Sequence, residues 1–419
     1  MVIGNGAREH TLAWKIAQSP RLDKLFVTPG NAGTAKVAQN LPVSASDIPA
    51  ITGAAQGNNI DLVMVGPEAP LTEGLVDSLN QAGIDAFGPQ KGAAQIEGSK
   101  VFAKDLMHKH GIPCAKSEAF TSFERAVVYV KQNPLPMVIK ADGLAAGKGV
   151  IIASSHDEAL AALDDIMRKK VFGSAGEKVL VEECLAGRET SLLAFTDGET
   201  VIPMVSACDY KRALDGDKGL NTGGMGCYSP SEFFTPELQE QVMETVMKPT
   251  IRAMAEEGYP YKGVLYAGLM MTDEGPKVLE FNARFGDPET QVILPLLKTD
   301  LVDIMQAIIE ERLADIVIEW SDEACVGVVL ASEGYPESYR KGFPVGGLEG
   351  IDSGVMVFHA GTAHNEKGEI ITSGGRVLTV VARGKDYSAA RQKVYQNISR
   401  ISFEGCWYRR DIAIINNPQ

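Results

Sequence analysis

The most informative segment of the sequence is Lys277-Val-Leu-Glu-Phe-Asn-Ala-Arg-Phe-Gly-Asp-Pro-Glu-Thr-Gln291. It predicts a β-strand, in which successive side chains point to opposite faces. The apolar face would hold Leu279, Phe281, Ala283 and Phe285, and the other face Val278, Glu280, Asn282 and Arg284. Same-face residues lie roughly 6.6 Å apart along a strand. Glu280 and Asn282 could therefore hold a hard cation between them, with the guanidinium of Arg284 one step further along.

An edge strand with a solvated polar face is the alternative interpretation of this stretch. We favour the metal-and-phosphate interpretation, because the strand breaks at Gly286-Asp287-Pro288 and resumes with another carboxylate, Glu289. A polyanion bridged by Mg²⁺ needs oxygen ligands for the metal and a fixed positive group beside them.

Length and composition indicate a multidomain globular protein. The 419 residues suffice for two to four domains of ~100–200 residues each. The hydrophobic share of 45% and the charged share of 22% are ordinary for a globular chain. The net charge of −14 argues against nucleic acid or an anionic membrane as a partner. We also expect no membrane-spanning segment, because no apolar run reaches 18 residues.

The six cysteines are scattered and form no Cys-x-x-Cys pair, which favours a reducing, cytoplasmic location. The six histidines show no zinc-binding spacing. Met1-Val-Ile3 reads as the end of a strand, so we expect the first strand natively to begin a few residues earlier.

The first hundred residues alternate strand and helix, with a helix near 72–82, and predict a doubly wound parallel sheet. The first loop, Gly4-Asn-Gly-Ala-Arg-Glu9, lacks the third glycine of a dinucleotide fingerprint. No acidic ribose partner follows the second strand either, so a Rossmann dehydrogenase is disfavoured. A phosphate or a ribose phosphate at the helix N-terminus still fits.

Further elements follow from periodicity and caps. Ser99 would cap a helix over 99–110 that places Lys100 and Lys104 on one face. We expect a long amphipathic helix over 236–257 and a hairpin of strands 263–271 and 276–285. Beyond about 322, strands at 324–331, 355–361 and 376–382 and a helix at 387–401 predict a separate α+β module.

A glycine-rich loop, Lys140-Ala-Asp-Gly-Leu-Ala-Ala-Gly-Lys-Gly149, connects two predicted strands. It is not a Walker A loop, which would need Ser or Thr at Gly149 and a helix afterwards. As a lid over a triphosphate it would offer backbone N–H groups and Lys148 to the phosphates, while Lys140 approaches from the strand end. A flexible hairpin tip is the alternative.

Two more segments carry polar chemistry. Val181-Glu-Glu-Cys-Leu185 ends a strand and could offer backbone groups to an adenine edge, with Glu189 near the ribose. Asp209-Tyr-Lys-Arg212 and Asn221-Thr-Gly-Gly-Met-Gly226 form a basic patch and a second glycine loop. Their backbone N–H groups could cradle a carboxylate or a phosphate, but an ordinary surface loop fits this segment equally well.

Together these segments resemble the ATP-grasp superfamily, through the lysine strand with its glycine lid, the Val-Glu-Glu-x-Leu hinge and the Glu-x-Asn strand. Within it, the chain is similar to the phosphoribosylamine–glycine ligase family over essentially its whole length. The likeness rests on six sequence motifs: Gly4-Asn-Gly-Ala-Arg-Glu-His10, Pro29-Gly-Asn-Ala-Gly33, Gly66-Pro-Glu-Ala-Pro-Leu71, Lys140 to Val150, Asn221 to Gly226 and Glu280 to Gln291.

The resemblance implies an α/β and α+β multidomain protein: a Rossmann-like N-terminal substrate domain (1–97), an ATP-grasp domain (98–320) with a mobile lid at about 116–186, and a small C-terminal α+β domain (321–419). It implies ATP-dependent ligation of glycine to 5-phosphoribosylamine through glycyl phosphate, with Mg²⁺ or Mn²⁺, in de novo purine synthesis. A monomer with small-molecule substrates is expected. Another ATP-grasp carboxylate–amine ligase or carboxylase is the alternative. A catalytically dead nucleotide-binding regulator is disfavoured, because Lys140, Lys148, Glu280, Asn282 and Arg284 are all present.

The same resemblance assigns the site residues. Arg284 and Lys148 are the expected catalytic residues, and Glu280 and Asn282 the metal ligands. The ATP-binding residues would be Lys104, Lys140, Gly147, Gly149, Glu182, Glu183, Cys184, Leu185, Glu189 and Arg212. The substrate-binding residues would be Gly6, Asn31, Gly66, Pro67, Glu68, Asp209, Gly223, Gly224, Asp287 and Glu289. The strand Tyr266–Met271 lacks the acidic ligand that many superfamily members carry there, so Glu280 would provide most of the metal binding.

Overall fold

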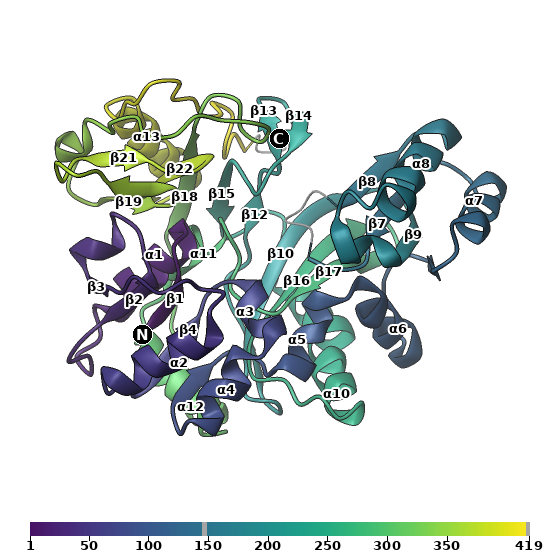
Figure 1. Cartoon of the computed structure of the whole chain (residues 1–419), viewed down its shortest axis with the longest axis horizontal. Helices are drawn as coiled ribbons and strands as arrows, with labels where there is room; N and C mark the ends of the chain where they lie inside the picture. Colours follow the sequence, from purple (N-terminus) through teal and green to yellow (C-terminus); the bar gives the residue numbers. More distant parts are fainter. Residues whose placement is uncertain (145–148, 416–419) are drawn as a thin grey trace.

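A computed structural model describes residues 1–144 and 149–415. Figure 1 shows the N-terminal part at lower left, the C-terminal part at upper left and a lobe projecting at right. A central antiparallel sheet lies between them. Among the described residues, no helix combines the length and the apolar character that a membrane span needs.

The N-terminal part confirms the predicted doubly wound parallel sheet, with strand order β3-β2-β1-β4-β5. Its strands are β1 (Val2–Gly4), β2 (Phe26–Pro29), β3 (Gln39–Asn40), β4 (Leu62–Val65) and β5 (Asp85–Phe87). Its helices are α1 (Ala7–Ile16), η1 (Thr34–Lys36), α2 (Ile48–Gly57), α3 (Glu68–Glu73), α4 (Leu75–Gln81) and α5 (Lys91–Gly98). The helix expected near 72–82 is confirmed as α4, although it begins only at Leu75. Gly74, at φ 96°, takes the left-handed conformation that glycine tolerates, and it divides α3 from α4.

The central sheet has the order β11-β10-β16-β17. Its strands are β10 (Arg188–Thr196), β11 (Val201–Pro203), β16 (Gly263–Thr272) and β17 (Gly275–Asn282). The helices of this part are α6 (Lys100–His110), α9 (Pro236–Val242), η4 (Met243–Met247), α10 (Lys248–Glu256), α11 (Thr290–Ile293), η5 (Leu294–Leu296), α12 (Leu301–Ile309) and η6 (Leu313–Asp315). Ser99 caps α6 as predicted, because its Oγ accepts from the backbone N–H of Phe102 at 3.1 Å.

A bulge in β17 corrects one expectation about the opening stretch. Glu280 pairs with Gly268, but Val278 pairs with Leu269, so Leu279 is an extra residue in the ladder. The bulge shifts the alternation by one residue, and Val278 is therefore buried in the same core as Phe281, not on the polar face. Glu280, Asn282 and Arg284 keep their predicted common side.

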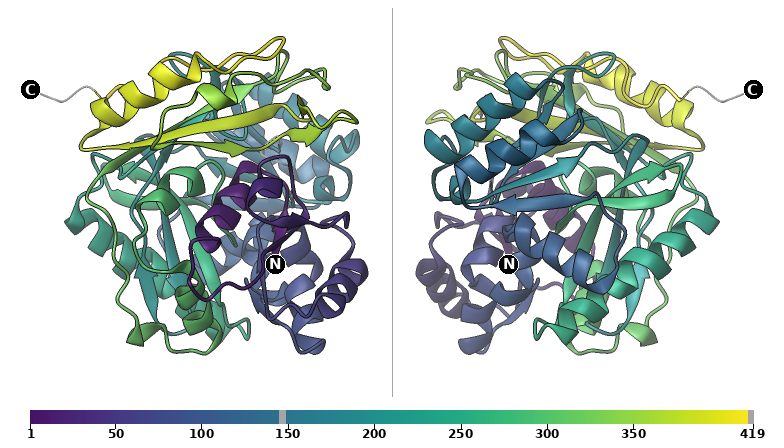
Figure 2. Two further views of the ribbon diagram at one scale, coloured as in Figure 1. Left: turned by 90° about the vertical axis from the view of Figure 1, so that its left-hand side faces the viewer. Right: turned by 90° about the vertical axis from the view of Figure 1, so that its right-hand side faces the viewer.

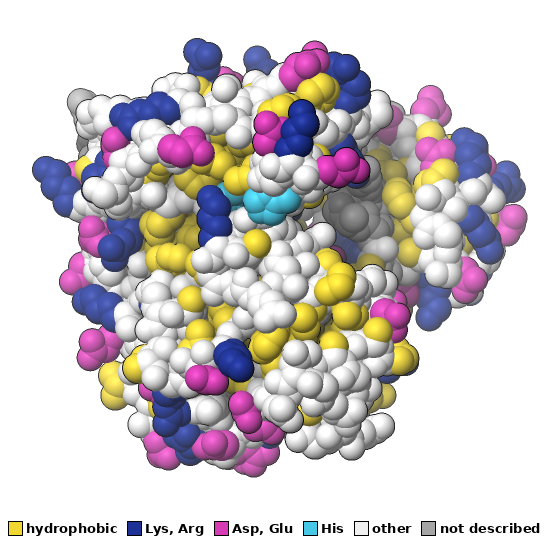
Figure 3. All heavy atoms as spheres, turned by 60° about the vertical axis from the view of Figure 1, so that its left-hand side comes forward, with side chains coloured by type: hydrophobic (Ala, Val, Ile, Leu, Met, Phe, Trp, Pro, Cys, Tyr) yellow, Lys and Arg dark blue, Asp and Glu magenta, His cyan; other side chains and the backbone are white. Residues whose placement is uncertain are grey.

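The lobe is a second antiparallel sheet with the order β6-β9-β7-β8. Its elements are β6 (Ser117–Phe120), α7 (Phe123–Gln132), β7 (Met137–Ala141), β8 (Val150–Ala153), α8 (His156–Leu163), η2 (Asp164–Arg168), η3 (Gly173–Glu177) and β9 (Val179–Glu183). The predicted strands on either side of the glycine loop are confirmed as β7 and β8. The lobe has a hydrophobic core of its own, and it stands apart from the rest in the space-filling view (Figure 3).

The C-terminal α+β part is confirmed, but its sheet is not separate as expected. Its order is β12-β15-β18-β22-β19, and β12 (Cys208–Asp209) and β15 (Gly226–Ser229) come from the central part of the chain. The other strands are β18 (Ala324–Ala331), β19 (Val355–His359) and β22 (Arg376–Gly384), followed by α13 (Tyr387–Ile398). Two small hairpins, β13–β14 (Arg212–Leu214 and Lys218–Asn221) and β20–β21 (Thr362–His364 and Ile370–Thr372), and η7 (Leu348–Gly350) complete it. Both side views place α13 and this sheet along the upper side of the molecule (Figure 2).

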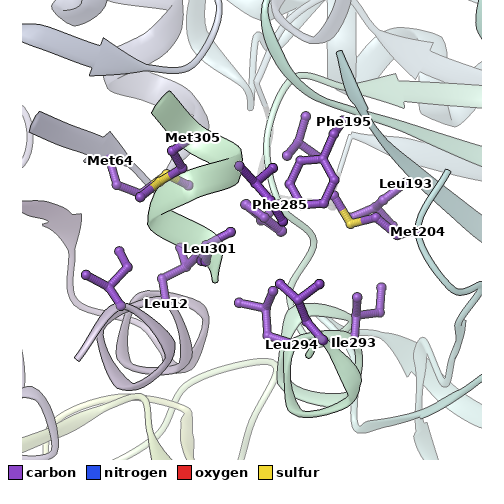
Figure 4. Close-up of a cluster of buried hydrophobic side chains, with 14 of the residues drawn as sticks. Leu12, Met64, Leu193, Phe195, Met204, Phe285, Ile293, Leu294, Leu301 and Met305 are labelled. Carbon is purple, nitrogen blue, oxygen red and sulfur yellow. The ribbon is translucent and has the colours of Figure 1, made fainter. Parts of the chain in front are cut away.

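One hydrophobic core joins the N-terminal and central parts (Figure 4). Leu12 of α1 and Leu301 of α12 belong to it, with Leu294 between the central strands and the helices. Phe285, just after β17, is fully buried between Phe87 and Phe195, with ring centroids 6.5 and 6.0 Å away. This packing fixes the end of β17 where Arg284 begins the polar site.

Replacing Leu294 by Ala should test this shared core. We expect the substitution to lower the free energy of unfolding by about 2–5 kcal/mol, because it leaves a cavity in a fully buried cluster. The measurement is the urea midpoint followed by circular dichroism. Val317→Ala is the control, since Val317 is 79% exposed. A Leu294→Ala midpoint equal to that of the control would contradict the packing described here.

Candidate active site

A cavity of about 880 Å³ lies where the lobe, the central sheet and the N- and C-terminal parts meet. Lys140 and Glu182 line it from the lobe, Glu280 from β17, Glu68 from α3 and Arg376 from β22. The space-filling view shows the molecule hollowed between the lobe and the remainder (Figure 3).

Most of the predicted site residues come together in this cavity. Its lining includes Glu68, Lys104, Lys140, Gly149, Glu182, Glu183, Cys184, Leu185, Glu189, Asp209, Arg212, Gly223, Glu280, Asn282, Arg284, Asp287 and Glu289. The lining does not include Gly6, Asn31, Gly66, Pro67 and Gly224. Gly147 and Lys148 lie outside the residues that the structure describes.

The polar side of β17 is strongly electrostatic. Burial would raise the pKa of Glu280, but Lys211, Lys140 and Lys100 more than offset burial and lower it, so the carboxylate is anionic. Asn282 is two residues along on the same side and accepts from Arg284 Nη2 at 3.4 Å. No group of three or more His, Cys, Asp or Glu suited to a metal occurs within 1–144 and 149–415. Glu280 and Asn282 fit a hard cation that takes its remaining ligands from phosphate and water.

A buried triad joins α6 to the lobe. Glu182 Oε1 lies 3.3 Å from Lys104 Nζ, and Glu182 Oε2 lies 2.9 Å from Lys140 Nζ. All three side chains are almost wholly buried. Two lysines share one carboxylate, so the triad keeps a net positive charge beside the cavity, as an anion-binding site requires. Burial lowers the pKa of Lys104, although Glu182 partly opposes the effect.

Arg284 is enclosed by two carboxylates. Its Nε lies 3.1 Å from Glu68 Oε2, and its Nη2 lies 3.0 Å from Glu97 Oε1. Glu97 also accepts from the backbone N–H of Ala283 at 2.7 Å. Burial raises the pKa of Glu97, and Arg284 partly opposes the effect. The orientation of the guanidinium is thus fixed, because it pairs with one carboxylate from α3 and one from α5.

A second acidic group lies at Glu289 and Asp209. Glu289 is 3% exposed and accepts from the Tyr266 hydroxyl at 2.7 Å. Burial, and next the charge of Asp209, raise the pKa of Glu289 to about 7. Burial also raises the pKa of Asp209, although Lys211 partly opposes the effect. Two such carboxylates in one cavity are suited to an ammonium group, which would relieve their repulsion.

The glycine loop and the C-terminal sheet meet at Arg376. Its Nη2 lies 3.2 Å from Asp287 Oδ2, and its Nη1 donates to the carbonyls of Gly223 and Gly224. Arg376 thereby ties the second glycine loop to the segment that follows β17.

The remaining predicted residues are not part of the cavity lining. The Asn31 side chain donates to the carbonyls of Asn5 at 2.9 Å and His359 at 2.8 Å, which joins the N- and C-terminal parts. The backbone N–H of Gly6 donates to Glu9 Oε2 at 2.7 Å. A Cβ at Gly66 would lie 2.7 Å from the backbone carbonyl oxygen of Ile3, as well as 2.3 Å from Glu9 Oε1, so this position requires glycine. Their roles in substrate binding stay predictions.

Sequence reasoning missed several residues of the lining. They are Arg8, Glu97, Lys100, Lys211, Tyr266 and Arg376. Lys100 carried a signal, since it shares a helix face with Lys104, and its Nζ donates to the carbonyl of Gly143 at 2.9 Å. Arg376 had no comparable signal, because only the fold brings β22 to this cavity.

The raised pKa of Glu289 predicts a pH-dependent stability. A carboxyl with a folded pKa of about 7, against an ordinary 4.5, stabilises the fold below pH 4.5, and this contribution is lost as the pH rises through 7. Between pH 4.5 and pH 8, the free energy of unfolding of the native chain should therefore fall by up to about 3 kcal/mol more than that of Glu289→Gln. Urea titrations at both pH values measure the difference, with the exposed Glu349→Gln as control. Equal pH dependence in all three proteins would contradict a raised pKa at Glu289.

Comparison with known proteins agrees with this geometry. Family models for the phosphoribosylglycinamide synthetase N domain, ATP-grasp (A) domain and C domain match residues 1–97, 98–290 and 325–414. The phosphoribosylamine–glycine ligase of Halalkalibacterium halodurans is 50% identical over 99% of this chain and 96% of its own length. That of Haemophilus influenzae is 50% identical over 99% and 97%.

Solved structures give the same result. The crystal structure of phosphoribosylamine–glycine ligase from Thermotoga maritima is 34% identical, with a TM-score of 0.85 over 98% of each chain. A biotin carboxylase from Campylobacter jejuni has a TM-score of 0.74 over 97% of this chain and 92% of its own, but at 15% identity it shows the fold alone. From its three matched domains and its full-length relatives, the chain belongs to the phosphoribosylglycinamide synthetase family of ATP-grasp ligases.

Proposed function

We propose that the chain joins glycine to 5-phosphoribosylamine through glycyl phosphate and releases ADP, phosphate and glycinamide ribonucleotide. The observation that carries the proposal is the 50% identity to phosphoribosylamine–glycine ligases over 99% of the chain. The cavity supports it, because lysines, a metal-binding pair and two carboxylates with raised pKa line one space. This is the reaction of an ATP-dependent ligase in purine biosynthesis.

ATP would lie between the lobe and the central sheet. Glu182 to Leu185 would line the adenine, and Glu189 the ribose. The phosphates would be approached by Lys104, Lys140 and Arg212. They would also be approached by Gly147, Lys148 and Gly149 of the glycine-rich loop. The shared carboxylate of Glu182 supports this arrangement, because it holds both buried lysines within 3.3 Å of its oxygens.

Glu280 and Asn282 would hold the divalent cation, and we propose Mg²⁺ or Mn²⁺. Such a cation neutralises charge on the transferring phosphoryl group. Oxygen donors of this kind suit both ions, and a cation with few protein ligands relies on substrate phosphates. The lowered pKa of Glu280 supports the assignment, because the ligand must be deprotonated.

Asp209 and Glu289 would receive the ammonium group of glycine, and this would direct the glycine carboxylate toward the phosphates. Arg284 would stabilise the charge that develops on the acyl phosphate, since Glu68 and Glu97 fix the direction of its guanidinium. The amine of phosphoribosylamine would then attack the acyl carbon, and phosphate would leave. The lid would exclude water during both steps.

The acceptor would bind where the N-terminal part meets the segment after β17. The predicted contacts are Gly6, Asn31, Gly66, Pro67, Glu68, Gly223, Gly224 and Asp287. Arg8 and Arg376 add positive charge to the lining beside them, which suits a ribose phosphate. We further propose that the chain acts as a monomer in the cytoplasm. The unpaired state of all six cysteines supports this compartment.

Omission of single substrates tests the proposed reaction. ADP release should require glycine, and product formation should require both glycine and phosphoribosylamine. ADP release that does not depend on glycine would refute the proposal, as would a product formed from a carboxylate other than glycine at the same rate.

Replacing Glu280 by Gln tests the metal site. We expect activity at limiting Mg²⁺ to fall about 100-fold, because the substitution removes the charge of the main ligand. The measurement is the rate against Mg²⁺ and Mn²⁺ concentration, with circular dichroism to confirm the fold. Glu274→Gln is a matched control, since Glu274 lies in the turn of the same hairpin and is 78% exposed. Equal metal dependence of the two variants would refute the role of Glu280.

A further inference from the structure

The β13–β14 hairpin carries part of the cavity lining but has little support of its own. Arg212, Asp217 and Asn221 of this hairpin face the cavity. Its strands form a two-stranded sheet with an irregular register, and β14 is exposed along its whole length. Isolated two-stranded hairpins are marginally stable in water. Contacts from elsewhere must therefore hold it in place.

Arg409, near the end of the described chain, makes the main contacts with the hairpin. Its side chain is 1% exposed. Its Nη1 donates to the carbonyl of Arg212 and to Asp217 Oδ1, each at 2.9 Å. Its guanidinium also lies 4.8 Å from the ring centroid of Tyr210. One buried side chain thus contacts the first strand of the hairpin, its turn, and Tyr210, which lies two residues before the hairpin.

The next two residues extend these contacts, and we call Arg409, Arg410 and Asp411 the C-terminal clamp. Asp411 accepts from Arg409 Nε at 2.8 Å and Nη2 at 2.6 Å, and from the backbone N–H of Gly216 at 2.8 Å. The backbone N–H of Arg410 donates to Asp215 Oδ1 at 2.8 Å. The planar fork of an arginine can bind Asp411 through two nitrogens and still reach the hairpin, which lysine cannot do.

The clamp is itself fixed to the C-terminal part. The hydroxyl of Tyr395, in α13, donates to the carbonyl of Arg409 at 2.8 Å. Arg391, also in α13, donates through Nη2 to the carbonyl of Arg410 at 2.6 Å. The clamp therefore joins the packed helix of the C-terminal part to an exposed hairpin at the cavity. A purely stabilising role would not require a buried arginine, because well-packed apolar residues serve stability as well or better.

We propose that Arg409 is a positioning residue for ligation, which holds the β13–β14 hairpin so that Arg212 faces the nucleotide phosphates. It touches no substrate and acts through the backbone of Arg212. The proposal rests on the proposed function, which places Arg212 at the ATP phosphates. It gives the C-terminal segment a part in nucleotide binding, although the segment lies almost 200 residues from Arg212 in the chain.

Steady-state kinetics of Arg409→Met, Arg212→Met and the double variant test the proposal. We expect Arg409→Met to raise KM for ATP about tenfold, the effect of losing one charge-assisted contact, with a smaller change in kcat. If Arg409 acts through Arg212, the two effects are not additive, and Arg409→Met adds little in the Arg212→Met background. Arg409→Lys should restore part of the ATP affinity. Arg400→Met is the control, because exposed Arg400 pairs with Asp352 in the same part of the chain and should keep the native KM.

Two results would overturn the role of Arg409. The first is a KM for ATP in Arg409→Met that equals the KM in Arg400→Met. The second is that Arg409→Met raises the KM for ATP by the same factor in the native chain and in the Arg212→Met variant. If Arg409→Met does not fold, we would use Asp411→Asn in its place, since this substitution removes the charge but keeps the shape of the side chain. Its KM for ATP is then compared in the same two ways. A native chain without glycine-dependent ADP release would instead refute the proposed function and, with it, the kinetic role of Arg409.

Discussion

The geometry of the cavity depends on the placement of Arg284 between Glu68 and Glu97. A buried guanidinium is costly unless it is paired, and here the two carboxylates come from α3 and α5 of the N-terminal part. The arginine itself follows the edge strand of the central sheet, and Phe285 beside it is buried between Phe87 and Phe195. Neither part can shift without separating charges or opening the core. The end of β17, and with it Glu280 and Asn282, is therefore fixed against the N-terminal sheet.

Charge is distributed unevenly along the cavity. Toward the lobe, Lys104 and Lys140 share Glu182 and leave positive charge for an anion. Toward the second glycine loop, Asp209 and Glu289 have raised pKa values and favour a cationic group. Glu280 lies between these regions and is kept anionic by the lysines around it. A nucleotide would compensate the positive charge at one end of the cavity, and the ammonium group of an amino acid would compensate the negative charge at the other end.

The sequence predicted the parts of the fold and site that depend on local pattern. Alternation placed Glu280, Asn282 and Arg284 on one side, and the cap at Ser99 placed Lys104 on its helix. Val278 was misplaced, because a bulge is set by pairing with β16 and leaves no mark in the alternation. Arg376 was missed because long-range packing alone brings it to the cavity, and Arg8 was missed although its loop was a candidate phosphate site. The joining of β12 and β15 to the C-terminal sheet depends on the same long-range packing, so it was also missed.

The shared sheet has a consequence for how the chain can be divided. β15 forms a ladder with β18 over four residue pairs, from Gly226–Val328 to Ser229–Cys325. A fragment beginning at residue 321 would leave that edge of β18 without its neighbour, and unpaired edges are templates for pairing between chains. Independent expression of the C-terminal part is therefore at risk of aggregation. Insertion of foreign sequence is better tolerated at an exposed turn, such as residues 366–368, than at the junction between the two parts.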